Sequence, residues 1–284
     1  MSKSVLVIDS QILNSFQSCQ TKFYYDFVLN VKTLVKPVAF DKGDLLHYML
    51  KFHYKMIRHN QRRAGKEIPY SEIVKTCITK AEKYLVSLDL DSELGTEVIK
   101  TYYDYSEYYR NCSWQILEVE KPFARVIHED ENIKIIYCGI IDLLTNVAIV
   151  DHKSSSRRGT PSGLSNQFMG YAYSLDVHNV VINKVGFQKT LKNEEKFERH
   201  TKSYPTDNLN EWKENTIKVG LEIYKGLNDV LELQKNKNFT SCDKYSGCIF
   251  QRVCESSPEA REFIIQKDYR IGDSWKPLKT IETI

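Results

Sequence analysis

The sequence contains no long hydrophobic run. No segment approaches the roughly 18 consecutive apolar residues that a membrane-spanning helix needs, and the N-terminal stretch MSKSVLVIDS is too short and too polar for a secretory signal. We therefore expect an intracellular, cytoplasmic protein without a membrane partner. Internal repeats and low-complexity linkers are also missing from the 284 residues, which favours one compact domain over two.

A strong charge of either sign is missing too. The chain carries 40 Lys and Arg against 37 Asp and Glu, a formal net charge of +3, which is compatible with a nucleic-acid partner but does not establish one. There is no G-x-x-x-x-G-K-[ST] phosphate-binding loop, so any DNA unwinding would come from another polypeptide. The hydrophobic content of 42% is enough for a substantial core.

Hydrophobic periodicity predicts helices first, then strands, then a mixture. Helices are expected at 10–27, from Asp41 or Asp44 to about 52, twice within 71–109, at 161–177 and at 208–233; strands are expected at 114–127, 133–145, 147–153, 180–190 and 196–204. The tyrosines between 102 and 109 are interpreted as helix packing with a solvated face. This order indicates an α/β or α+β domain with a helical elaboration.

Two predicted strands end in groups that can carry chemistry. GIIDLL contains Asp142, and IVDHKSSS contains Asp151 and Lys153, with a short turn at Asn146 between them. Strand alternation sends Asp151 and Lys153 to one face and His152 to the other. Two neighbouring carboxylates repel one another unless a cation lies between them, and Mg²⁺ or Mn²⁺ would both remove that repulsion and activate a water. The alternative is a surface ion pair at a strand end, which contributes little.

The same residues resemble a known family. GIID followed by IVDHKS is similar to the pattern G-x-x-D … h-h-D-x-K-[ST] of the RecB-type branch of the PD-(D/E)xK nuclease superfamily. The resemblance implies a restriction-endonuclease-like fold, in which helices flank a central mixed sheet and a helical insertion is present. It also implies a Mg²⁺ or Mn²⁺ site held by His47, Asp142, Asp151 and the backbone carbonyl of His152, with Lys153 activating water.

Flanking motifs extend the resemblance from about residue 10 to residue 175. Gln167 and Tyr171 lie four apart on one helix face, like the family's Q-x-x-x-Y motif, which implies a role near the active site; alone they would be a surface amide beside a core ring. Gly43 precedes His47 at the spacing of a G-x-x-x-H motif. Glu120 matches an acidic position often seen on the preceding strand, and a surface glutamate is the equal alternative.

Seven cysteines in a chain without export signals are more typical of thiols or metal ligands than of disulfides. Cys242, Cys248 and Cys254 follow one another with five residues between each pair, among polar residues, whereas Cys77, Cys112 and Cys138 lie in helix or strand patterns. Some RecB-type nucleases, similar to the AddB nuclease domain and CRISPR-adaptation nucleases, hold a 4Fe–4S cluster with one N-terminal and three C-terminal cysteines. The resemblance implies that Cys19 completes such a staple; the even spacing leaves Zn²⁺ as the alternative.

These observations predict a single nuclease domain over 1–284. It comprises a helical insertion at about 55–112, a catalytic core at 114–205 and a cysteine segment at 239–258. The expected activity is metal-dependent DNA hydrolysis, as an exonuclease on single strands or duplex ends, with a helicase, recombination or CRISPR-type protein as partner. The alternative is a non-catalytic DNA-binding or assembly module that keeps the fold and the staple. Arg157 and Arg158 are expected to bind DNA. The late hairpin is formed by the predicted strands 180–190 and 196–204 with a turn at 191–195, and its cations either track phosphates or are simply solvated: Lys184, Lys189, Lys192, Lys196, Arg199 and Lys202.

Overall fold

Three consecutive strands form the middle of the sheet. The computed structural model describes residues 3–34, 38–63, 65, 67–88, 91–155, 162–188, 190–243 and 247–275. Within these, β3 (Ile116–Glu129), β4 (Ile133–Thr145) and β5 (Ile149–Ser155) run antiparallel to one another in succession. Their β-branched, alternating sequences favour this pairing, and the expected antiparallel arrangement is confirmed.

β4 pairs with three other strands, and part of one of its edges is left without a strand partner among the described residues. β3 pairs along one edge of β4, while β1 (Ser4–Ile8) pairs in parallel with residues 133–137 of β4. β5 pairs with β4 only at Leu143 and Leu144. Since a strand has two edges and β3 takes one, β1 and β5 occupy opposite ends of the other. Residues 138–142 have no strand partner on that edge among the described residues.

The remaining strands extend the sheet beyond β5. β6 (Asn179–Gly186) runs parallel to β5, and β7 (Phe197–Ser203) runs antiparallel to β6. The parallel pair requires a crossover, which contains α6 (Asn166–Leu175). A short helix, α7 (Asn193–Lys196), stands where a turn was expected before β7.

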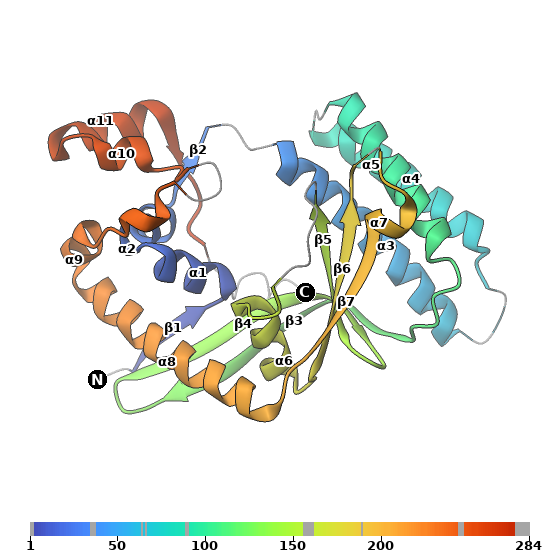
Figure 1. The fold of residues 1–284 in the computed structure, drawn as a ribbon, viewed down its shortest axis with the longest axis horizontal. Coiled ribbons are helices and arrows are strands. Elements are labelled where there is room, and N and C mark those ends of the chain that lie inside the picture. Colours follow the sequence, from blue (N-terminus) through green and yellow to red (C-terminus); the bar gives the residue numbers. More distant parts are fainter. Residues whose placement is uncertain are drawn as a thin grey trace.

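One face of the sheet is covered by α3 (Val38–Arg62), α4 (Tyr70–Leu88) and α5 (Ser92–Tyr108), grouped on the right in Figure 1. Leu46, Met49 and Tyr102 from these helices pack in one core with Val150 of β5. Tyr102 and Tyr105 are fully buried, which confirms that part of the tyrosine cluster is helix packing.

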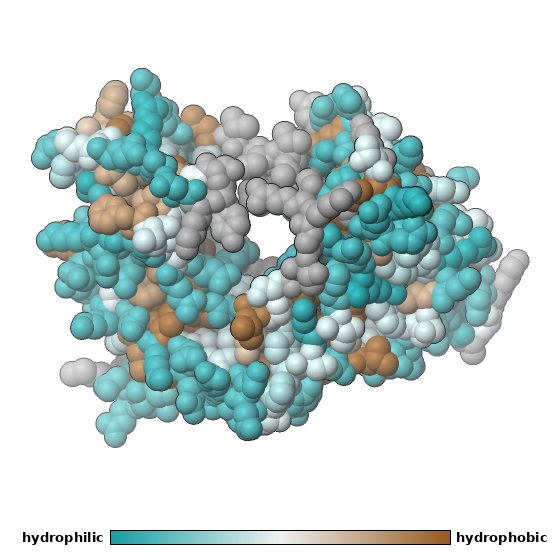
Figure 2. Space-filling model, viewed as in Figure 1, coloured by the Kyte–Doolittle hydropathy of each residue, from teal (hydrophilic) through white to brown (hydrophobic). Residues whose placement is uncertain are grey.

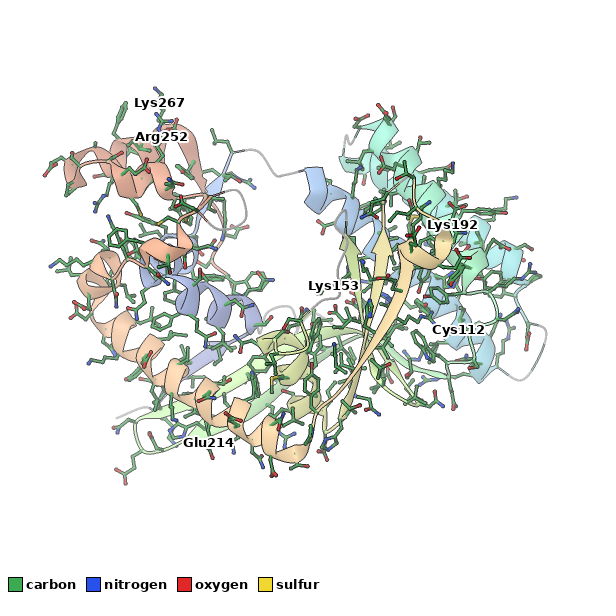
Figure 3. The ribbon with its side chains drawn as sticks, in the orientation of Figure 1. Cys112, Lys153, Lys192, Glu214, Arg252 and Lys267 are labelled. Atoms are coloured by element: carbon green, nitrogen blue, oxygen red, sulfur yellow. The ribbon has the colours of Figure 1, made fainter. Side chains whose placement is uncertain are left out.

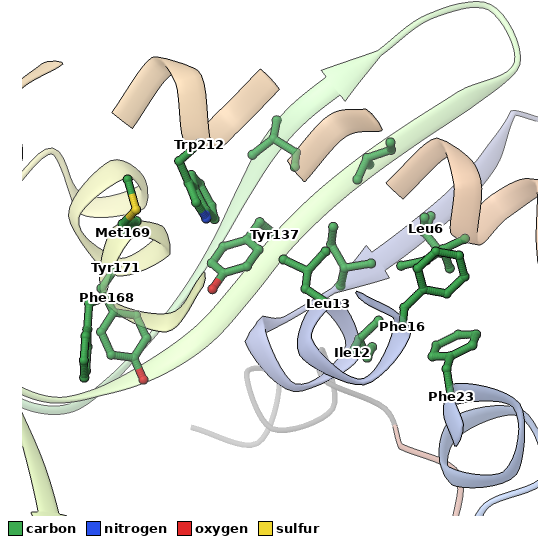
Figure 4. Packing of buried hydrophobic residues seen from close by; sticks show 14 of the residues in the cluster. Leu6, Ile12, Leu13, Phe16, Phe23, Tyr137, Phe168, Met169, Tyr171 and Trp212 are labelled. Carbon is green, nitrogen blue, oxygen red and sulfur yellow. The ribbon is translucent and has the colours of Figure 1, made fainter. Parts of the chain in front are cut away.

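The opposite face is covered by α1 (Ser10–Ser18), α6 and α8 (Thr206–Asn228). Figure 4 shows the aromatic centre of this core, where Tyr137 of β4 lies against Trp212 of α8. Phe16 of α1 and Phe168 of α6 belong to the same cluster. The sheet is therefore buried on both faces, as in layered α/β domains.

The two ends of the described chain meet. After α1 come α2 (Gln20–Phe23), the π-helical turn η1 (Tyr24–Val28) and β2 (Val31–Thr33); after α8 come α9 (Val230–Lys235), η2 (Phe239–Ser241), α10 (Gln251–Glu255), α11 (Pro258–Asp268) and β8 (Tyr269–Ile271). β2 and β8 form an antiparallel pair of their own. These segments gather on the left of Figure 1, away from α3–α5.

The expected α/β architecture, a central mixed sheet flanked by helices, is confirmed. β1 was not predicted, and the expected helix at 208–233 is two helices divided at Asp229, whose side chain caps α9. In the described part of the chain, no helix is both long enough and apolar enough to cross a membrane. Hydrophilic residues cover most of the face seen in Figure 2, which is hollowed between the two groups of helices.

Candidate metal centre

A cavity of about 270 Å³ opens at the gap between β1 and β5. Six side chains expected at the site line it: His47, Asp142, Asp151, Lys153, Gln167 and Tyr171. Each comes from an element that the fold brings to the gap, namely α3, β4, β5 and α6. Figure 3 shows Lys153 at the centre of the molecule, between the two groups of helices.

Asp142 and Asp151 lie where β4 and β5 diverge. The backbone N–H of His152 donates to Oδ2 of Asp142 at 2.6 Å, and Nδ1 of His47 lies 3.6 Å from the same oxygen. Burial raises the pKa of Asp142 to about 7, and the charge of Asp151 adds to this increase, while His47 opposes it. Two buried carboxylates this close repel one another when both are ionised, and a cation between them would remove that repulsion.

The second carboxylate is the more deeply buried. The Asp151 side chain is 2% exposed, and Nζ of Lys153 lies 2.9 Å from its Oδ2. That oxygen nevertheless accepts no hydrogen bond from the described residues. A buried carboxylate oxygen that is not fully satisfied suits a metal ligand.

Gln167 links the members of the site. Its Oε1 accepts from Nζ of Lys153 at 2.9 Å, while its Nε2 donates to Oδ1 of Asp151 at 3.1 Å and to the Tyr171 hydroxyl at 2.8 Å. The Tyr171 hydroxyl donates to the Ile140 carbonyl at 3.0 Å, on the unpaired edge of β4. Gln167 therefore orients Lys153 and Asp151, and Tyr171 supplies a hydrogen bond to a β4 carbonyl where β4 lacks a strand partner.

His152 faces the other side of β5 and belongs to a buried network. Its ring stacks on Tyr54 of α3, and Nδ2 of Asn183 lies 2.8 Å from its Nδ1. Burial holds the pKa of His152 well below its usual range, so the ring is neutral and accepts from Asn183. This network fixes the β5 backbone from behind, including the His152 N–H that bonds Asp142 and the carbonyl expected to bind metal.

Two glycines allow the close approaches at the site. A Cβ on Gly139 of β4 would lie 3.0 Å from Cζ of Phe123, and a Cβ on Gly43 of α3 would lie 3.0 Å from Oγ of Ser154. Gly43 lies one turn before His47, so it lets α3 approach the end of β5 closely enough for His47 to reach Asp142. These are the glycines of the two motifs identified in the sequence.

Other expected residues lie elsewhere. Glu120 does not line the cavity; its Oε2 pairs with Nζ of Lys51 at 3.3 Å, and its φ of 53° is unusual for a non-glycine residue. Arg157 and Arg158 lie outside the described residues. Two of the cations near the late hairpin already have partners within the protein: Lys184 is buried and pairs with Glu198, and the Arg199 guanidinium lies between the rings of Tyr109 and Trp114.

A second cavity, of about 680 Å³, is lined by Cys19, Cys242, Cys248 and Cys254. Burial raises the pKa of the Cys254 thiol, and neighbouring Cys248 and Cys19 raise it further. The backbone N–H of Asn238 donates to Sγ of Cys19 at 3.4 Å. Cys77 is buried in the hydrophobic core with α3 and α5, and Cys138 is buried on β4. The structure thus gathers the four cysteines that the sequence grouped.

In the described part of the chain, no three His, Cys, Asp or Glu side chains already converge closely enough to hold a metal ion. Both donor sets nevertheless fit metals chemically, with carboxylates and an imidazole at one cavity and four thiols at the other. Sequence reasoning missed Asp9, Ser10, Gln11 and Trp275, which also line the first cavity. Their positions follow from β1 and from the meeting of the chain ends, for which the local sequence has no motif.

Comparisons with known proteins identify a family for the chain. No curated protein sequence matches the chain. A solved structure entitled "Crystal structure of SSO0001" is similar at 15% identity and a TM-score of 0.33, covering 75% of this chain and 95% of that one. The family model of the PD-(D/E)XK nuclease superfamily matches residues 10–255. Because that match spans most of the chain and contains both motif strands and the cysteines, the protein belongs to the PD-(D/E)XK nuclease superfamily.

Proposed function

We propose that the protein is a Mg²⁺- or Mn²⁺-dependent deoxyribonuclease whose active site is the cavity around Asp142 and Asp151. The observation that carries the proposal is Oδ2 of Asp151, which is buried, lacks a hydrogen bond from the described residues and lies 2.9 Å from the ammonium of Lys153. A structural ion pair would be expected to satisfy its carboxylate more fully. Membership of the nuclease superfamily supports the same interpretation.

The side chains of His47, Asp142 and Asp151, with the His152 carbonyl, would hold the metal. Carboxylate and carbonyl oxygens are the donors that Mg²⁺ and Mn²⁺ prefer. When bound, the ion supplies Lewis-acid stabilisation of the phosphate and lowers the pKa of water. Burial, and after it the charge of Asp151, raises the pKa of Asp142, and a bound cation would favour the ionised carboxylate.

Lys153 would position the attacking water or neutralise charge on the phosphate oxygens. Its ammonium is already oriented by Oε1 of Gln167, so little reorganisation is needed when the substrate binds. Tyr171 anchors Gln167 to the Ile140 carbonyl and is therefore a positioning residue. Hydrolysis would leave a 5′-phosphate and a 3′-hydroxyl.

The proposed substrate is a single strand or a duplex end, cleaved exonucleolytically. A cavity of about 270 Å³ is better suited to one strand than to a duplex. Unwinding would come from a separate helicase, recombination or CRISPR-type partner.

The proposal includes a 4Fe–4S cluster at the second cavity, with Zn²⁺ as the alternative. Cys19, Cys242, Cys248 and Cys254 supply the four thiolates that either group needs, and they line one cavity. A group bound there would link the end of α1 to the segment before α10, beside the β2–β8 pair. Its role would be to staple the two ends of the nuclease domain.

The test is cleavage of end-labelled single- and double-stranded DNA by native protein and by Lys153→Ala, with Mn²⁺, Mg²⁺ or EDTA. We expect metal-dependent cleavage that Lys153→Ala reduces at least about 100-fold. Lys83→Ala, on the exposed side of α4, is the matched control and should cleave normally. DNA that is bound but never cleaved by folded, metal-supplemented native protein would contradict the nuclease assignment and support the non-catalytic module.

A further inference from the structure

Trp275, from the end of the described chain, reaches the cavity of the candidate metal centre. It lines this cavity together with Asp142, Asp151 and Lys153, although more than 120 positions separate it from each of them. The residue is 43% exposed, whereas Trp212 is buried in the core. A large aromatic side chain left this exposed beside a polar cavity is not explained by core packing.

Three contacts fix the position of the indole. β8 pairs with β2, and just after it Gly272 donates its N–H to the Asn30 carbonyl at 2.8 Å. The Trp275 backbone N–H donates to Oδ1 of Asn30 at 3.3 Å, and its Nε1–H donates to Oδ2 of Asp9 at 3.0 Å. The ring is therefore held along its polar edge, and these bonds do not use its apolar faces.

Asp9 is a rigid anchor for this bond. Its Oδ1 caps α1 by accepting from the N–H groups of Gln11 and Ile12, each at 2.9 Å. The residue is buried, and losing a partner there leaves a carboxylate oxygen without compensation for its lost hydration. The α1 N-terminus thus positions the acid, and the acid positions the indole at the cavity rim.

The two tyrosine rings of the cavity are not available to a ligand. Tyr137 and Tyr171 are buried, with hydroxyls bonded to the carbonyls of Asn166 and Ile140. Among the tyrosine and tryptophan rings of the described lining, Trp275 is therefore the one that remains accessible to a ligand, and His47 is assigned to the metal. Nucleobases stack on exposed aromatic rings whatever their sequence, because every base has a π-face.

We infer that Trp275 stacks on an unpaired nucleobase next to the phosphodiester held in the cavity. A base inside a duplex has both faces covered by its neighbours, so this platform selects single strands or frayed ends and is a substrate-positioning device. The inference deepens the proposed nuclease function and rests on it for the identity of the ligand.

Cleavage kinetics with a modified substrate test the inference. Native protein, Trp275→Ala and Trp275→Phe are compared on a single strand, intact or with an abasic site beside the scissile phosphodiester. We expect Trp275→Ala to lower kcat/KM on the intact strand about 5- to 150-fold, Trp275→Phe to retain most of the activity, and the native and Ala proteins to cleave the abasic strand equally. Equal losses on both strands would indicate a merely structural role and overturn the inference.

Binding separates failure of the inference from failure of the nuclease assignment. The same strands are titrated with Ca²⁺ onto Lys153→Ala protein, with and without Trp275→Ala, after circular dichroism has verified the fold. If the double variant binds the intact strand more weakly than Lys153→Ala does, and the two bind the abasic strand equally, stacking is supported even if no preparation cleaves DNA. Unchanged binding of the intact strand refutes stacking even if the native protein is an active nuclease.

Discussion

The backbone N–H of His152 donates a 2.6 Å hydrogen bond to Oδ2 of Asp142, across the point where β5 separates from β4. The bond replaces the ladder pairing that the two strands lose beyond Leu143 and Val150. It also orients one carboxylate of the proposed metal site without using a side chain. The stretch of β4 that lacks pairing with β5 therefore leaves the His152 N–H free to orient Asp142.

Asp142→Asn should uncouple metal binding from folding. An asparagine carbonyl oxygen can still accept from His152, and the repulsion with Asp151 disappears, so the metal-free variant should be at least as stable as the native protein. Mn²⁺ at about 100 times its Kd should stabilise the native protein by about 2.7 kcal/mol and the variant hardly at all. Thermal unfolding with and without Mn²⁺ measures both effects; equal stabilisation of the two proteins would exclude Asp142 as a ligand.

Gly139→Ala should damage the site by packing alone. The new Cβ would lie 3.0 Å from Cζ of Phe123 and 3.5 Å from Cε1 of Tyr171. Such overpacking typically costs about 1–3 kcal/mol, and displacement of Tyr171 would disturb Gln167 and lower kcat. Urea unfolding and the cleavage assay measure the two losses. Phe123→Leu in the same chain should restore part of both, and a double variant no better than Gly139→Ala would disprove the steric account.

Local patterns were sufficient for the two strands that carry the site. The β-branched run 133–145 predicted β4 with its bounds, and strand alternation predicted that Asp151 and Lys153 share a face opposite His152. The spacing of Gln167 and Tyr171 predicted that they share one helix face, which α6 satisfies, while their expected place near the site came from the resemblance to the nuclease family. In each case the periodicity of one element, or a turn of a few residues, determines the geometry.

Long-range relations were not predictable in the same way. β1 is only five residues long, and its parallel pairing with β4 involves residues about 130 positions away. The bond between Asp9 and Trp275 joins residues 266 positions apart. The charge pattern of the sequence did not predict which lysines are buried. Lys184 pairs with Glu198 directly across the β6–β7 ladder, and its side chain is buried. Such contacts depend on topology, which single-sequence periodicity does not specify.

His53 should make the protein less stable as the pH falls. Burial lowers the pKa of His53 from 6.5 to about 4, so between these values the unfolded chain binds a proton that the folded protein does not. The free energy of unfolding should therefore decrease from about pH 6.5 toward pH 4, by about 3 kcal/mol from this residue. Urea unfolding from pH 7.5 to 4.5 measures the slope.

The matched variant for this prediction is His53→Asn. The asparagine amide places a polar atom where Nδ1 of His53 lies 2.9 Å from the Tyr102 hydroxyl, but it does not titrate. The difference between the native and variant curves isolates the contribution of His53 from that of other acids and histidines. Parallel curves for the two proteins would contradict the prediction.

Cys254→Ala should remove the metal and the stability together. If four thiolates hold a cluster or zinc at the second cavity, loss of one should release it and lower the free energy of unfolding by more than about 4 kcal/mol, because the group links the two ends of the chain. Cys77→Ala is the control: it leaves a cavity in the core beneath α3–α5, so it should lose stability and keep the metal. Iron, sulfide and zinc analysis beside unfolding curves distinguishes the outcomes. Iron with sulfide identifies a cluster, zinc alone identifies the simpler staple, and native protein with neither would show that the four cysteines are free thiols gathered by packing.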